Sequence, residues 1–193
     1  MISLLAAALF LPLYPMSIVL NAAIARLRHP LARGLVLLAW PQLGVGVLQI
    51  AMQAVPAYSV PWALLTAGFY ALRLLTMRDM SLWAGYLATS GLALVWTLAF
   101  AGVEGEALHL FAFWFSLPAA LVALLAQPLT RRFGAAYAGL QAGRIGSLPR
   151  LSGALVVTVL AAVATPPFPG FFALLHVLHV LDLAGVVAVL AIW

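Results

Sequence analysis

The chain has 193 residues, of which 66% are hydrophobic and only 7% are charged, and its mean hydropathy is +1.17. A soluble domain carries roughly 25% charged residues, so this composition excludes a water-soluble globular protein and indicates an integral membrane protein. The net charge of +5 comes from nine arginines, without any lysine, against four acidic residues. The absence of cysteine excludes disulfides, a thiolate nucleophile and cysteine-ligated zinc or iron–sulfur clusters.

The first apolar run, 2–25, has no basic residue before it, so we expect a transmembrane helix here and not a cleaved signal peptide. Charge or proline separates it from six further runs, at 33–54, 61–77, 81–102, 107–127, 150–166 and 169–192. Because every backbone group in hydrocarbon needs an internal partner, runs of this length are predicted to be helices. The sequence therefore predicts an all-α polytopic membrane protein, a single domain over 1–193 with about seven transmembrane helices.

The arginines predict the orientation of these helices. They lie around the first loop (Arg26, Arg28, Arg33), the third (Arg73, Arg78) and the fifth (Arg131, Arg132, Arg144, Arg150). The second and sixth loops carry no charge, and the fourth carries only Glu104 and Glu106. By the positive-inside rule the arginine side is cytoplasmic, which predicts an outside N-terminus, a cytoplasmic loop over 128–149 and a cytoplasmic C-terminus. The expected location is the cytoplasmic (inner) membrane, crossed several times.

Ionisable side chains at membrane depth are costly, so they are the first candidates for function. His176, His179 and Asp182 are spaced by three in the last run, which brings neighbouring members within contact range on a helix. Histidine titrates near neutrality and a desolvated aspartate favours its neutral form, so this triplet could pass protons. The alternative is structural: the histidines bond carbonyls or partner subunits, and Asp182 pairs with an arginine of another chain. His109 and Asp79 complete the set of proton-path candidates.

The sequence contains no GxSxG, HExxH, P-loop or dinucleotide-binding motif, so the chain is not expected to be an enzyme by itself. We expect no metal and no cofactor in this chain, and a quinone would belong to a partner subunit. A haem would need opposed histidines on facing helices, for which His109 is the only intramembrane candidate outside the last run.

Four segments between residues 61 and 180 form a series. Asp79, Met80 and Ser81 make a turn before the helix "WAGYLATSGLAL", and "LHLFAFWFSLPAAL" with His109 follows. Next come the loop "RRFGAAYAGLQAGRIGSLPRLSG" and the segment "ATPPFPGFFALLHVL". This series resembles the antiporter-like subunits of respiratory complex I and the Mrp-type cation/proton antiporters. That family has, in the same order, an Asp-Leu-Lys turn, a histidine-rich broken helix ending in lysine, a GGL…P loop and a PPxPGF segment.

The chain departs from this family at its proton-carrying lysines. Ser81 and Leu117 stand where the family has lysines, and Phe113 stands in place of its second histidine. Arginine stays protonated in proteins and does not replace lysine as a proton carrier. The chain also has room for only about half of the family's inverted pair of five-helix units. It therefore resembles a shortened, divergent member without the lysine relay.

The proline-rich segment near the end is expected to be a structural elbow. Pro166, Pro167 and Pro169 would interrupt one helix at the outer interface, and Gly170 with Phe171 would begin the next. A proline at a helix start costs little, because its missing N–H would be unpaired anyway.

The resemblance implies a non-catalytic, accessory membrane subunit of a multi-subunit respiratory or ion-translocating complex, contributing to a neighbour's proton transfer. Its partners would be other integral membrane subunits in the lipid bilayer and a peripheral cytoplasmic subunit at the arginine loop, with no nucleic acid. Two alternatives stay open. The first is a small proton or cation transporter that uses histidine and aspartate in place of lysine, and the second is a quinone- or haem-associated redox subunit.

Overall fold

The computed structural model describes residues 2–51, 55–137 and 148–192. Over these ranges the chain forms helices and turns without a β-strand, which confirms the all-α prediction. The helices, in chain order, are α1 (Ile2–Phe10), α2 (Ser17–Arg26), α3 (Pro30–Ala51), α4 (Ser59–Thr76), α5 (Met80–Ala93), α6 (Val95–Phe100), α7 (Gly105–Phe133), α9 (Pro149–Ala162), α10 (Pro169–Val180) and α11 (Leu183–Ile192).

Three helical stretches in the described ranges are long and apolar enough to cross a membrane: Pro30–Ile50, Met80–Phe100 and Gly105–Phe133. They correspond to the predicted runs 33–54, 81–102 and 107–127, and they support the assignment to a membrane. The third continues to Phe133, so the loop predicted over 128–149 begins as helix, and its residues 138–147 lie outside the described ranges. The run 61–77 corresponds to α4, whose 18 residues reach about 27 Å. A hydrocarbon core is about 30 Å thick, so α4 comes close to spanning it.

The remaining predicted runs are not continuous helices. The run 2–25 is divided between α1 and α2, and the run 169–192 is divided between α10 and α11. The run 150–166 ends early, because α9 stops at Ala162 after 14 residues, about 21 Å. Prolines account for the first break and Asp182 marks the last, so seven uninterrupted spans are not what the described residues form.

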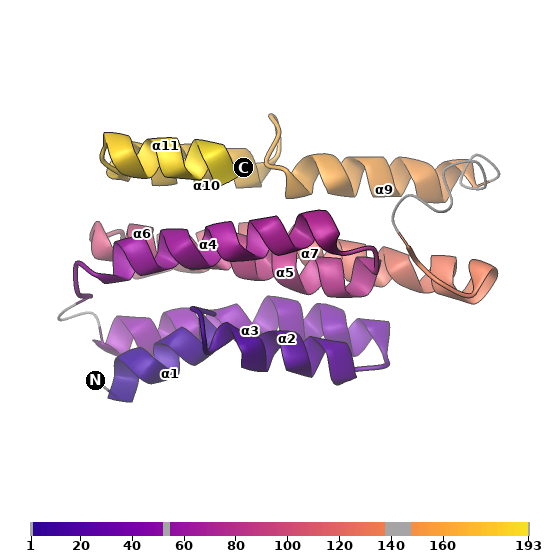
Figure 1. The fold of residues 1–193 in the computed structure, drawn as a ribbon, viewed down its shortest axis with the longest axis horizontal. Coiled ribbons are helices and arrows are strands. Elements are labelled where there is room, and N and C mark those ends of the chain that lie inside the picture. The colour runs from indigo at the N-terminus through magenta and orange to yellow at the C-terminus, as the bar shows by residue number, and fades with distance from the viewer. Residues whose placement is uncertain (1, 52–54, 138–147, 193) are drawn as a thin grey trace.

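The helices lie roughly parallel and antiparallel in three layers (Figure 1). The first layer contains α1, α2 and α3, the middle layer contains α4, α5, α6 and α7, and the last contains α9, α10 and α11. The core runs through the middle layer, where most residues of α5 and α6 are buried. Small residues allow this close approach: a Cβ on Gly91 would lie 3.0 Å from the Phe115 ring. Helices in lipid associate largely through such packing of small residues.

The helix ends that carry arginine lie together. In Figure 1, α2, α4 and α7 end, and α3 and α9 begin, at the same end of the bundle. Every described arginine lies in or next to one of these helix ends: Arg26, Arg28, Arg33, Arg73, Arg78, Arg131, Arg132 and Arg150. Arg144 lies outside the described residues. We call this end of the molecule the arginine end.

The last layer is divided along its length. In Figure 1, α9 covers the half near the arginine end, whereas α10 and α11 lie side by side over the other half. The turn 163–168 between α9 and α10 therefore lies near the middle of the bundle's long axis, and not at its end, where the outer interface was expected. The short length of α9 is the reason, since a 14-residue helix that starts at the arginine end stops well inside the bundle.

Candidate functional site

The first apolar segment breaks between Phe10 and Ser17. Pro12 and Pro15 lie within this break, and the Tyr14–Pro15 peptide bond is cis. Proline lacks an N–H and clashes with the carbonyl four residues earlier, so two prolines three positions apart end the helix. A break of this kind leaves backbone groups without helical partners, and such groups are tolerated at membrane depth only where protein surrounds them.

Three tryptophans supply partners for the carbonyl oxygens at the break. Trp40 of α3 donates its indole N–H to the Leu9 carbonyl at 3.0 Å, and Trp96 of α6 donates to Leu11 at 3.1 Å. Trp62 of α4 donates to the Tyr14 carbonyl at 2.6 Å. The indole N–H is a donor only, which suits it to a carbonyl that lacks its helical partner.

The side chain of Thr66 binds the backbone of the break at Tyr14, the same residue that Trp62 binds. Its Oγ1 accepts the backbone N–H of Tyr14 at 3.2 Å and donates to the Trp62 carbonyl at 2.8 Å. Both backbone groups of Tyr14 are therefore held by α4 side chains, one by Thr66 and one by Trp62. The broken segment is fixed by three different helices, so its shape is part of the fold.

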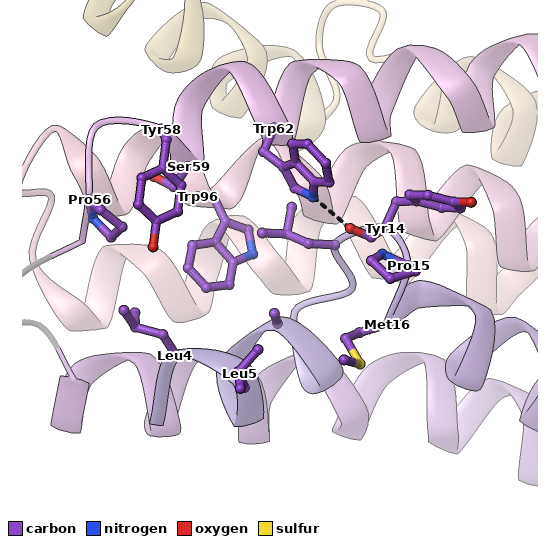
Figure 2. A pocket seen from close by; sticks show the side chains of 12 residues that line it. Leu4, Leu5, Tyr14, Pro15, Met16, Pro56, Tyr58, Ser59, Trp62 and Trp96 are labelled. Atoms are coloured by element: carbon purple, nitrogen blue, oxygen red, sulfur yellow. Dashed lines mark hydrogen bonds between the residues drawn. The ribbon is translucent and has the colours of Figure 1, made fainter. Parts of the chain in front are cut away.

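A cavity of about 380 Å³ lies beside the break (Figure 2). Its walls come from α1, the break itself, the segment before α4, α4 and α6, and they include Leu4, Leu5, Tyr14, Ser59, Trp62 and Trp96. Ligand sites are typically apolar cavities of about 300–1,000 Å³ with few polar groups, and this one fits that description. Leu5, Tyr58 and Trp62 are 54%, 71% and 46% exposed, so the cavity opens onto the outer surface of the bundle.

A polar cluster lies on the other side of the break, between α2, α4 and α5. Ser17 Oγ bonds the Tyr70 hydroxyl at 2.8 Å, and Asn21 Nδ2 donates to the Ser17 carbonyl at 2.9 Å and to Thr89 Oγ1 at 3.0 Å. Thr89 Oγ1 donates in turn to the Gly85 carbonyl at 2.8 Å. These bonds tie three helices together, and each described hydroxyl in the cluster has a partner.

The predicted site residue His109 lies in the first turns of α7 and pairs with Gln42 of α3. His109 Nδ1 donates to Gln42 Oε1 at 2.6 Å, and Gln42 Nε2 donates to the His109 carbonyl at 3.2 Å. The amide oxygen only accepts, so this pair requires a proton on Nδ1. Gln42, His109 and the exposed Glu106 line a shallow open groove.

His176, His179 and Asp182 are all exposed, on the α10–α11 pair. The His176 ring packs on Phe111 of α7 with centroids 5.3 Å apart. Asp182 lies between the two helices, and its Oδ1 accepts the Gly185 N–H at 2.9 Å as the N-cap of α11. The three side chains make no hydrogen bond to one another within the described part of the chain.

Asp79 also acts as a helix cap. Its Oδ1 accepts the N–H groups of Ser81 at 2.8 Å and Leu82 at 3.4 Å at the start of α5. The Met80 N–H donates to the Ala136 carbonyl at 3.0 Å, so the segment after α7 is fastened to the same turn. Asp79 lies at the arginine end of the bundle, whereas His109 lies at the opposite end, where α7 begins.

The elbow residues lie where α9 gives way to α10. The Pro166–Pro167 bond is cis, and Thr165 Oγ1 donates to the Leu160 carbonyl at 2.9 Å at the end of α9. Pro169 is in the first turn of α10 and Gly170 is buried against α9, where a Cβ would lie 3.5 Å from the Ala161 carbonyl. The Phe171 ring packs edge-on against Phe172. Pro118, Phe168 and Gly170 also line a second cavity of about 230 Å³ beside the turn.

The break in the first segment and its partners are not among the features predicted from the sequence. The signal was present in "LPLYP", because two prolines so close together are incompatible with a continuous helix. No sequence pattern identifies the indole donors, because Trp40, Trp62 and Trp96 are 31, 48 and 85 positions away from the carbonyls that they bind.

In the described ranges, no group of three His, Asp or Glu side chains is placed to hold a metal ion. The described residues that carry the resemblance to the antiporter-like subunits lie at the start of α5 and along it, in α7, at the start of α9, in the turn before α10 and in α10, whereas residues 138–147 of the loop lie outside the described residues. That resemblance stays a prediction from the sequence. No protein-family model matches this chain, and no curated protein is significantly similar to it.

Proposed function

We propose that this chain is an accessory membrane subunit of a multi-subunit respiratory or ion-translocating complex, in which a partner chain covers the α10–α11 face. The observation that carries the proposal is the exposure of His176 on that face, with His179 and Asp182 exposed beyond it towards the end of the bundle opposite the arginine end. Ionisable side chains in membrane segments normally face protein or a water-filled cavity, because hydrocarbon does not solvate them. A second membrane protein that packs on α10 and α11 would provide that surrounding.

The arrangement of the other candidates favours a subunit over a transporter that works alone. His109 is engaged by Gln42 in a groove between α3 and α7, Asp79 caps α5 at the arginine end, and Asp182 caps α11. These side chains do not bond one another in the described ranges, and His109 and Asp79 lie at opposite ends of the bundle. A proton path that uses any of them would need groups from a neighbour, as the resemblance to the antiporter-like subunits implies.

The proposed topology retains seven helical segments in the cytoplasmic membrane, with the first and the last bent. The arginine end faces the cytoplasm, in keeping with the positive-inside rule. This orientation puts the N-terminus outside, because α1 begins at the opposite end of the bundle. The last helix, α11, runs back from that outer end and directs the C-terminus towards the cytoplasm.

Site-specific photo-crosslinking in the native membrane tests the covered face. A photoreactive residue at Leu175 or Leu183, which are 45% and 81% exposed on α10 and α11, should give one discrete crosslinked protein product. The matched control is Leu65 on the outer side of α4, with 59% exposure. Crosslinks only to lipid at Leu175 and Leu183 would overturn the proposal.

The variant Asp182→Asn distinguishes the proposed subunit from the alternative, a transporter that works alone. Asparagine is as good an N-cap as aspartate, so α11 should stay folded while the ionisable group is lost. If the chain is a subunit, the variant should still assemble with its partners. The purified chain in proteoliposomes should then show no proton flux, with or without the substitution. Proton flux by the purified chain that the variant abolishes would favour the transporter.

A further inference from the structure

The cavity beside the broken first segment contains one polar group that the fold leaves unused. Ser59 is 3% exposed, lines the cavity, and its Oγ has no hydrogen-bond partner in the described part of the protein. Among the described residues, the seven other buried serine and threonine side chains each make a hydrogen bond: Ser17, Thr66, Thr89, Ser90, Thr97, Ser116 and Thr158. A buried hydroxyl without a partner is unfavourable, so Ser59 calls for an occupant that bonds it.

The position of Ser59 explains why the fold does not satisfy it. Thr66 and Thr89 donate to the carbonyl four residues earlier in their own helices. Ser59 is the first residue of α4, so no helical carbonyl precedes it. The backbone N–H groups of this turn are already used, since Ser59 N–H donates to Pro56 at 2.9 Å and Val60 N–H donates to Ala57 at 3.3 Å. The hydroxyl is therefore the group that remains for a ligand.

The residues around Ser59 indicate the depth in the membrane at which the polar group of that ligand lies. Tyr58 and Trp62, 71% and 46% exposed, flank Ser59 at the end of the bundle opposite the arginine end. Exposed tyrosine and tryptophan gather at the level of the lipid headgroups. A ligand group that accepts the Ser59 hydroxyl would therefore lie at the headgroup level of a membrane. The rest of the cavity extends along α1 towards Tyr14 and Pro15 (Figure 2).

We propose that this cavity binds a diacyl lipid without net charge, with one acyl chain in the cavity and its ester carbonyl accepting the Ser59 hydroxyl. Leu4, Leu5 and Ala8 give the chain an apolar wall, and the opening past Leu5 and Trp62 admits it from the side of the bundle. No arginine is among the described residues that line the cavity, and the described charged residues at this end of the bundle are the acidic Glu104, Glu106 and Asp182. The site therefore offers no attraction for an anionic headgroup.

The test uses phosphatidylcholine with a photoreactive diazirine in one acyl chain, added to the purified full chain in detergent. Label should concentrate on α1 residues 4–8 and on Tyr58 and Trp62. Leu5→Trp should reduce this labelling at least about five-fold by filling the cavity, whereas Leu35→Trp on the outer side of α3, 67% exposed, should not change it. Label spread evenly over the exposed faces, or unaffected by Leu5→Trp, would overturn the proposal.

An ether-linked analogue tests the hydrogen bond separately, because it carries the same photoreactive chain without the ester carbonyl. With the ester lipid, Ser59→Ala should reduce labelling about five-fold, the effect of one hydrogen bond. With the ether lipid, the same variant should have no effect. An equal loss with both lipids, or no loss with the ester, would overturn the role of Ser59. Size-exclusion profiles like that of the original chain show that the variants are folded.

Discussion

Trp62 donates its indole N–H to the carbonyl oxygen of Tyr14 at 2.6 Å, joining two residues that are 48 positions apart in the chain. This bond is one of three that attach the break in the first apolar segment to its neighbours, the others coming from Trp40 and Trp96. The break is therefore a fixed element of the fold, and the cavity beside it has walls whose positions are held.

Trp62→Phe should lower the free energy of unfolding by about 1 kcal/mol, because the Tyr14 carbonyl loses its hydrogen-bond partner. The measurement is the thermal midpoint of unfolding in mild detergent. It is determined from the loss of the monodisperse chromatographic peak with rising temperature. Trp83→Phe is the control, since Trp83 packs against the core without a hydrogen bond from its indole among the described residues. Equal losses for the two variants would show that the Tyr14 bond contributes nothing.

Gly44→Ala should destabilise the contact between α1 and α3. A Cβ at Gly44 would lie 2.5 Å from the Leu11 backbone nitrogen and 2.7 Å from the Phe10 carbonyl carbon. These are backbone atoms that do not move aside, so the two helices must separate, at a cost of about 1–3 kcal/mol. Gly46→Ala, two residues along the same helix, is the matched control, because its Cβ would meet nothing within 4 Å. A thermal midpoint that falls equally for both would contradict the close approach.

Tyr70→Phe should cost about 0.6 kcal/mol and at most about 1.7, the range measured for hydrogen bonds between membrane helices. The variant removes the bond to Ser17 and leaves that hydroxyl buried. Tyr86→Phe is the comparison, since the Tyr86 ring packs on Tyr70 while its hydroxyl makes no hydrogen bond within the described ranges. Thermal midpoints should fall for Tyr70→Phe only. A larger fall for Tyr86→Phe would be inconsistent with the polar cluster.

The orientation can be measured directly because the chain has no cysteine. Ala57→Cys, in the exposed segment before α4, should react with a membrane-impermeant maleimide added to intact cells. His29→Cys, exposed between α2 and α3 at the arginine end, should react only after the membrane is permeabilised. The reverse pattern would place the N-terminus in the cytoplasm.

The sequence predicts the continuous helices well and the interrupted ones poorly. Apolar length alone identifies α3, α5 with α6, and α7, since hydrocarbon leaves helix as the form that satisfies every backbone group. It does not distinguish one span from two half-length helices. The first segment has the composition of a span, yet Pro12 and Pro15 divide it, and the sequence does not say which side chains take over the freed carbonyls.

The candidate proton residues show the same limit. Spacing by three predicts that His176, His179 and Asp182 follow one helix, but the helix ends at Val180 and Asp182 caps the next one. The residues that line the main cavity come from segments up to 92 positions apart, from Leu4 to Trp96. Such a site depends on tertiary packing, so Ser59, an ordinary serine in the sequence, becomes notable only through its burial.

Purification of the tagged protein from its native membrane in mild detergent shows whether this chain functions inside a larger membrane complex. Mass spectrometry should then find other integral membrane subunits in fixed stoichiometry, including antiporter-like ones, and crosslinking should connect them to the α10–α11 face. Recovery of the chain alone, or only with copies of itself, would contradict the proposed role as a subunit.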